Sequence, residues 1–133
     1  MTASLLTDQE RAELAGAIDA RMATLRGEIV AGLRQSDDPT VLQLANHFEE
    51  TDDAAVASLE LATEIAAVER DVQELTALQR ARERLRAGTY GECTDCGTAI
   101  PLARLRAQPA ALRCVPCQNA AERASGAHAP PRL

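Results

Sequence analysis

The chain has 133 residues and a formal charge of −6, and only Phe48 and Tyr90 are aromatic. This length allows one domain with an elongated extension but excludes two full globular cores. No apolar run approaches the roughly 20 residues of a membrane span, and the N-terminus lacks the pattern of a secretion signal, so we expect a cytoplasmic protein without a membrane partner.

The charges are unevenly distributed along the chain. Residues 1–75 hold sixteen acidic residues and five arginines, whereas residues 76–133 hold four acidic residues and nine arginines. Phosphate binding needs positive charge, so the acidic half is unsuited to lie along DNA. Direct and specific DNA binding is therefore not expected.

The first long helix is predicted to begin at Thr7, because Thr7 and Glu10 have the spacing of a capping box. A single apolar stripe at helical spacing follows, formed by Leu14, Ile18, Met22, Leu25, Ile29 and Leu33. One face of this helix is therefore expected to pack against another helix.

A second long helix is predicted to end at Gly88, a residue type that commonly terminates helices. Its apolar residues recur with heptad spacing at Leu61, Ile65, Val68, Val72 and Leu75. The two stripes predict an all-α fold, in which residues 1–87 form an antiparallel coiled-coil hairpin.

Two breaks compete for the turn of this hairpin, one at residues 37–39 and one at residues 49–53. Reversal at the first break would pair a short helix with a much longer one. Because a helix rises 1.5 Å per residue, much of the longer helix would then have no partner. Reversal at the second gives arms of similar length. We therefore expect the tip near 49–53 and interpret Pro39 as a defect within the first arm.

Four cysteines follow the hairpin with the spacing C-x2-C-x17-C-x2-C, which is typical of a structural zinc site. The ligands would be Cys93, Cys96, Cys114 and Cys117. Two disulfides or a redox-active pair are the alternatives, and a reducing cytoplasm favours the metal. One Zn²⁺ would fold a module at 88–124 that includes a short C-terminal helix. Residues 125–133 are predicted to form a disordered tail.

A closed four-thiolate site leaves no position for water, and so it is structural and not catalytic. The sequence contains no phosphate-binding loop and no evident pair of nucleophile and base. We therefore expect that the protein is not an enzyme and has no catalytic residues.

The zinc segment resembles the DksA/TraR family of bacterial transcription factors, which act on RNA polymerase. The matching segments are Gly88-Thr-Tyr-Gly-Glu-Cys93-Thr-Asp-Cys96-Gly97, then Ile100, then Arg104-Leu-Arg-Ala-Gln-Pro109, and Cys114-Val-Pro-Cys117-Gln118. The match is specific over 88–118 and architectural upstream. It implies that the hairpin enters the secondary channel of the polymerase. We expect the protein to be a monomer.

The resemblance also implies an acidic tip with the pattern Asp-x-x-Asp-x-Ala. Counting back from Cys93 places this pattern on Glu50, Asp53 and Ala55, with Glu in place of the first Asp. Such carboxylates would approach the active site of the polymerase and its magnesium. Asp53 could equally serve in the first turn of the second helix, where acids complement the helix dipole.

Some members of this family bind the alarmone guanosine tetraphosphate together with polymerase through basic residues. The corresponding positions here are Ala77, Gln108 and Gln118, and none carries a positive charge. Since polyphosphates need Lys or Arg for most of their affinity, we expect weak or absent alarmone dependence.

Four arginines form a basic run before Gly88, at positions 80, 82, 84 and 86. They are expected to form a solvated helix end, and contact with an acidic polymerase surface or nucleic acid is the alternative. The rival to polymerase control is a zinc-finger adaptor that binds another protein or nucleic acid.

Overall fold

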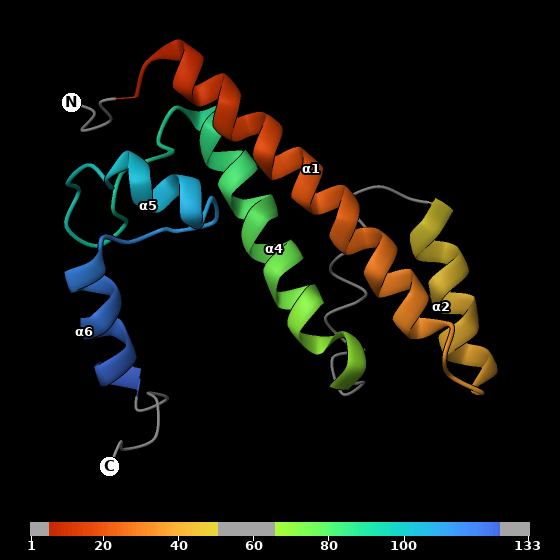
Figure 1. Cartoon of the computed structure of the whole chain (residues 1–133). Helices are drawn as coiled ribbons and strands as arrows, with labels where there is room; N and C mark the ends of the chain where they lie inside the picture. Colours follow the sequence, from red (N-terminus) through yellow and green to blue (C-terminus); the bar gives the residue numbers. More distant parts are fainter. Residues whose placement is uncertain (1–5, 51–65, 126–133) are drawn as a thin grey trace.

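The computed structural model describes residues 6–50 and 66–125, and these are mainly helical (Figure 1). The helices are α1 (Asp8–Leu33), α2 (Pro39–Glu50), α4 (Ala66–Ala87), α5 (Leu102–Ala107) and α6 (Val115–Ser125). Within these two ranges no strand forms, although Glu92 and Ala99 make an isolated bridge. None of the described helices is long and apolar enough to cross a membrane. The predicted all-α class is confirmed.

Helix α1 begins at the predicted capping box. The Glu10 N–H donates to Thr7 Oγ1 at 3.0 Å, and the Thr7 N–H donates to Glu10 Oε1 at 3.0 Å. The Glu10 N–H is one of the first-turn donors that have no partner within the helix. The apolar stripe that follows is entirely buried, as predicted, at Leu14, Ile18, Met22, Leu25, Ile29 and Leu33.

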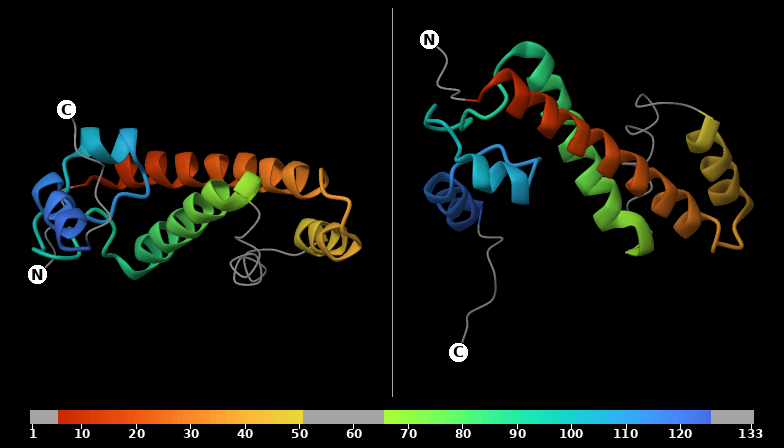
Figure 2. Two further views of the ribbon diagram at one scale, coloured as in Figure 1. Left: turned by 90° about the horizontal axis from the view of Figure 1, so that it is seen from below. Right: turned by 45° about the horizontal axis from the view of Figure 1, so that its top comes forward.

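Helix α4 lies antiparallel to α1 and covers this stripe (Figure 1, Figure 2). Its own buried residues are Val68, Val72, Leu75, Leu78 and Ala81. Beside them, Arg21 binds Glu74 through two contacts of 2.8 and 2.9 Å, and Arg82 lies 3.5 Å from Asp19. The first predicted stripe therefore meets the described part of the second, at Val68, Val72 and Leu75, in an antiparallel hairpin. Leu61 and Ile65 of the second stripe lie outside the described residues.

Gly32 lies at a close approach of α1 to α4. A Cβ atom at this position would lie 2.6 Å from Cγ1 of Val68, which is closer than side-chain atoms pack. In contrast, a Cβ atom at Gly16 would have nothing within 4 Å. The absence of a side chain at Gly32 thus allows the two helices to touch.

The chain reverses direction at residues 34–38, before the predicted tip. The Thr40 N–H donates to Asp38 Oδ1 at 2.9 Å, and the Leu42 N–H donates to the Asp38 carbonyl oxygen at 3.0 Å, so Asp38 caps a new helix. Pro39 takes the first position of that helix, where a missing N–H removes no helical hydrogen bond. The prediction that Pro39 is a defect within one long arm is wrong.

Helix α2 returns along the last turns of α1. Its residues Ala45 and Phe48 are buried, and the Arg26 guanidinium lies 4.1 Å from the centre of the Phe48 ring. Arg26 Nη2 donates to the Phe48 carbonyl oxygen at 3.0 Å, and Arg34 pairs with the Glu49 carboxylate. The apolar face of this helix therefore meets α1. A hairpin tip at 49–53 would instead require this face to meet the second arm.

The predicted tip at 49–53 is described only in part. Glu49 and Glu50 form the exposed end of α2. Asp53 and Ala55 lie outside the described residues. Likewise, α6 extends to Ser125, and residues 126–133 of the predicted tail are not among those described.

Candidate metal centre

The C-terminal module begins where Gly88 ends α4. The Thr89 N–H donates to the Arg84 carbonyl oxygen at 3.0 Å. Arg84 Nη2 in turn donates to the carbonyl oxygens of Thr89 and Glu92 at 2.8 and 2.7 Å. The φ angle of 82° at Gly88 is the left-handed conformation that glycine adopts readily, so the helix ends as predicted. One arginine of the last helical turn thus fastens the hairpin to the module.

The first pair of cysteines lies on a tight turn. The Cys93 N–H donates to the Thr98 carbonyl oxygen at 2.8 Å, and the Gly97 N–H donates to the Cys93 carbonyl oxygen at 3.0 Å. The φ angle of 79° at Gly97 allows this turn. The Cys96 N–H points at the Cys93 Sγ from 3.5 Å, so the turn directs a backbone donor at the buried sulfur.

The second pair lies at the start of α6, where Cys117 belongs to the first helical turn. The Gln118 N–H donates to the Cys114 carbonyl oxygen at 2.9 Å. Two contacts bring this segment to the first pair: the Thr94 N–H donates to the Leu112 carbonyl oxygen at 2.8 Å, and Arg113 Nε donates to Asp95 Oδ2 at 2.9 Å. The two pairs therefore face each other across the module.

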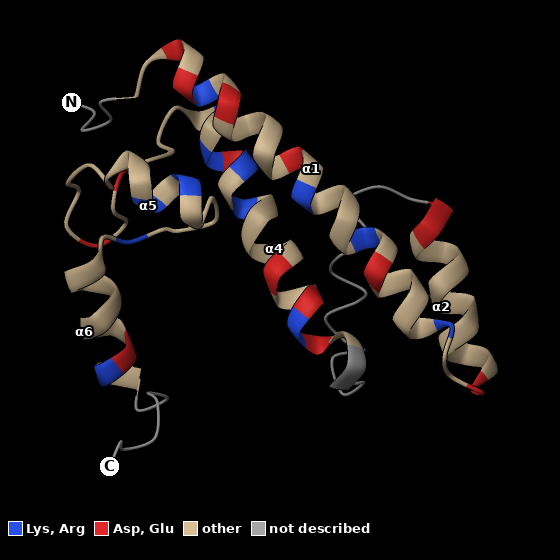
Figure 3. Ribbon diagram, viewed as in Figure 1, with Lys and Arg blue, Asp and Glu red and all other residues tan. Residues whose placement is uncertain are grey.

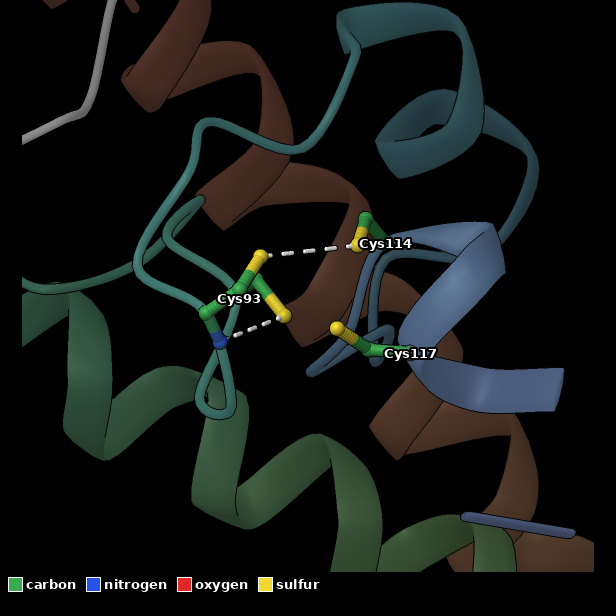
Figure 4. Close-up of side chains that lie close together, drawn as sticks. Cys93, Cys114 and Cys117 are labelled. Carbon is green, nitrogen blue, oxygen red and sulfur yellow. Dashed lines mark hydrogen bonds between the residues drawn. The ribbon is translucent and has the colours of Figure 1, made fainter. Parts of the chain in front are cut away.

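All four sulfur atoms lie within 4.8 Å of one another, and the Sγ atoms of Cys96 and Cys114 are 3.8 Å apart. A tetrahedral zinc site with Zn–S bonds of about 2.3 Å has sulfur–sulfur edges of about 3.8 Å. Figure 4 shows the sulfurs of Cys93, Cys114 and Cys117 gathered together. None of the four cysteines forms a disulfide. The site binds one structural zinc ion with all four positions filled by thiolates.

Hydrogen bonds prepare the first pair for a metal. Burial raises the pKa of Cys93, but hydrogen bonds from the backbone of Cys96, Cys114 and Asp95 outweigh it and bring this pKa to about 6. The Thr98 hydroxyl lies 2.9 Å from the Cys96 sulfur and lowers the pKa of that thiol. Because zinc binds thiolates, donors that stabilise the thiolate also favour metal binding.

The module has a small apolar core beside the metal. Tyr90, Ile100 and Leu105 are buried together with Cys93. The Tyr90 hydroxyl donates to the Pro109 carbonyl oxygen at 2.8 Å, and burial raises the pKa of Tyr90 to about 12, so the donor stays protonated. Helix α6, in contrast, contains no buried residue. The metal therefore holds together a segment whose own core is minimal.

The four arginines of the basic run have three different environments, which cannot be predicted from their spacing alone. Basic residues gather on the C-terminal half of α4, next to the module (Figure 3). Arg82 pairs with Asp19, and Arg84 binds backbone carbonyl groups. Only Arg80 and Arg86 are exposed, as predicted for a solvated helix end. The sequence feature that could have predicted the role of Arg84 is its position in the last helical turn before Gly88.

A cleft of about 730 Å³ separates the module from the hairpin. Arg21, Glu74 and Leu78 line the hairpin side, and residues 107–113 with Arg104, Gln118 and Glu122 line the module side. Of the three positions that the resemblance connects with the alarmone, Gln108 and Gln118 line this cleft and Ala77 does not. The structure thus places two of these three residues in one cavity.

Glu50, the one predicted tip residue that the structure describes, lies apart from the metal centre. Glu50 ends α2, and α2 lies at the end of the hairpin opposite the module (Figure 1). No contact of Glu50 with the cysteines or the cleft is present among the described residues.

Comparison with known proteins matches residues 88–123 to the prokaryotic dksA/traR C4-type zinc finger. An uncharacterized protein of Aquifex aeolicus is 38% identical over 45% of this chain and 41% of its own length. The RNA polymerase-binding transcription factor DksA of Caulobacter vibrioides is 28% identical over 81% of this chain and 75% of its own.

Among solved structures, transcription factor DksA2 from Pseudomonas aeruginosa superposes with a TM-score of 0.64 at 23% identity. The alignment covers 94% of this chain and 92% of that one. At this identity the likeness concerns the fold, and it extends over the hairpin as well as the zinc module.

Proposed function

We propose that this chain regulates transcription by binding RNA polymerase, because its zinc segment matches the dksA/traR C4-type zinc finger and its fold is similar to that of DksA proteins. The observation that carries this proposal is a four-thiolate zinc module attached to one end of a narrow antiparallel helical hairpin. The protein acts in the cytoplasm as a monomer, as a regulator and not as an enzyme, and it makes no specific contact with DNA.

The hairpin is the part that enters the polymerase. A helix of 26 residues such as α1 is about 39 Å long, and two paired helices are narrow enough for a channel. In this proposal the zinc module docks at the rim of the secondary channel. Glu50, Asp53 and Ala55 form the part of the chain that acts near the active site, through charge and hydrogen bonding.

The test is binding of the zinc-loaded protein to bacterial core RNA polymerase in competition with a known secondary-channel factor. We expect competitive binding at micromolar concentrations or below. Asp53→Asn removes one charge with little change of shape, so it is expected to abolish the effect on transcription and to preserve binding.

Glu83→Gln is the matched control, because Glu83 is an exposed acid on α4 near the module. It is expected to change neither binding nor transcription. Failure of the zinc-loaded protein to bind polymerase at micromolar concentrations would instead favour the zinc-finger adaptor.

We further propose that guanosine tetraphosphate has little or no influence through this protein. Two acidic residues, Glu74 and Glu122, line the cleft that contains Gln108 and Gln118. The Arg21 guanidinium in the same cleft is already paired with Glu74. Arg113 is likewise paired with Asp95, and Arg104 donates to the Arg113 carbonyl oxygen. A polyphosphate would therefore meet two carboxylates and arginines that already have partners, which disfavours binding.

Equilibrium binding of labelled guanosine tetraphosphate to polymerase, with and without this protein, checks this expectation. We expect the same number of nucleotide sites in both samples. The double substitution Gln108→Lys and Gln118→Lys should add affinity if the missing cations are the cause. An additional site formed with the unsubstituted protein would contradict the proposal.

A further inference from the structure

An ion pair joins the zinc module to α1 between residues that are 93 positions apart. Arg106 of α5 donates from Nε to Glu13 Oε2 at 2.9 Å and from Nη2 to Glu13 Oε1 at 3.1 Å. Two parallel contacts between a guanidinium and a carboxylate fix direction as well as distance. The pair therefore constrains how α5 is oriented against the second turn of α1.

A small apolar contact lies beside this pair. A Cβ atom at Gly91 would lie 3.1 Å from Leu6 Cδ1 and 3.7 Å from Leu105 Cδ1, so the two leucines enclose this glycine. Arg11 Nη1 donates to the Leu6 carbonyl oxygen at 3.1 Å and holds Leu6 in place. Together with the covalent connection at Gly88, this contact joins the module to the N-terminal end of the hairpin.

The cleft lies between the same two bodies. Its polar side chains bond within their own walls, since Arg21 binds Glu74 in the hairpin and Gln118 binds Glu122 in α6 at 2.8 Å. Arg113 of the module wall likewise binds Asp95 of the module. The walls can therefore separate or approach without breaking any of these bonds.

We infer that Glu13 and Arg106 form a latch that fixes the zinc module against α1 and thereby sets the width of the cleft. When the latch is closed, residues 107–113 and α6 stay at a fixed distance from α4. When it opens, the module turns about the contact of Leu6 with Gly91 and Leu105.

The latch depends on the opposite charges of Glu13 and Arg106, and both side chains are in contact with solvent. The two side chains are 53% and 47% exposed, and the hydrogen bond from Arg106 lowers the pKa of Glu13. Both groups are therefore charged at neutral pH. Exposed pairs are screened as the Debye length falls from about 10 Å at 0.1 M salt to about 3 Å at 1 M, so high salt weakens the latch.

The experiment measures the distance across the cleft in the free, zinc-loaded protein. Spin labels are attached through unnatural amino acids at Gln73 of α4 and Asn119 of α6, both exposed, because the cysteines are needed for the metal. Pulsed electron paramagnetic resonance should give one narrow distance distribution. Glu13→Arg alone or Arg106→Glu alone should lose the narrow component, and 1 M salt should have the same effect on the unsubstituted protein.

The double substitution Glu13→Arg with Arg106→Glu recreates the pair in reverse and should restore the narrow distribution. The control is the pair of Arg34 and Glu49, which is similarly exposed but joins α1 to α2 at the other end of the hairpin. Its reversal should leave the distance unchanged.

Zinc content and far-ultraviolet circular dichroism show whether each variant is folded. A narrow distribution in both single variants, or a double variant that stays broad, would overturn the latch. The experiment uses no polymerase, so this outcome is independent of the proposed function.

Discussion

Removal of zinc is expected to unfold residues 88–125 and to leave α1 and α4 paired. The module buries only a few side chains besides Cys93, and α6 contains no buried residue. A structural zinc ion contributes about 10–16 kcal/mol to folding in small domains, which is more than this core can replace. The seam between α1 and α4 buries many apolar side chains and contains no metal ligand, so the hairpin is expected to stay folded without the metal.

Amide hydrogen exchange with and without a chelator measures this result segment by segment. Protection should disappear from α5 and α6 and persist in α1 and α4. Cys93→Ser should have the same effect as the chelator, since it removes the buried ligand. Val115→Ala is the control, because Val115 lies beside the site and is 50% exposed. Unchanged protection of α6 after zinc removal would show that the module folds without the metal.

Gly32→Ala is expected to destabilise the hairpin, although alanine is the better helix former. The added Cβ atom would lie 2.6 Å from Val68 Cγ1, and Val68 is β-branched and buried, so it cannot move aside freely. Overpacking of this kind costs about 1–3 kcal/mol. This exceeds the roughly 0.5–1 kcal/mol that alanine adds in a helix interior.

Gly16→Ala is the matched control and should have the opposite sign. A Cβ atom at Gly16 has nothing within 4 Å, so only the gain in helix propensity remains. Thermal unfolding followed by circular dichroism compares the two variants. Combining Gly32→Ala with Val68→Ala should recover part of the loss if the two side chains collide. An increase in the melting temperature for Gly32→Ala alone would contradict the close approach.

The parts of this protein that could be predicted are those that depend on neighbours in the sequence. The capping box from Thr7 to Glu10 is a four-residue pattern, and the buried stripes repeat with the helical period. The zinc site follows from two Cys-x-x-Cys pairs. In each of these features the geometry is fixed by spacing along the chain.

The reversal at residues 34–38 could not be obtained in the same way. The sequence offers Pro39 as a break but does not say whether the next apolar face meets the first helix or the second. The burial of Phe48 under Arg26 decides this, and that contact joins residues 22 positions apart. The pair of Glu13 and Arg106 leaves no local signal either, since it depends on how the module is placed against α1.

Tyr90 has a practical consequence for work on this protein. The chain contains no tryptophan and only this tyrosine, so its tyrosine fluorescence comes from one residue inside the zinc module. The ring is buried, and its hydroxyl donates to the Pro109 carbonyl oxygen, so its emission reports the local environment of the module. The far-ultraviolet dichroism comes mostly from the hairpin, which holds the longest helices. Loss of metal and melting of the hairpin can therefore be followed as two separate optical signals in the unlabelled protein.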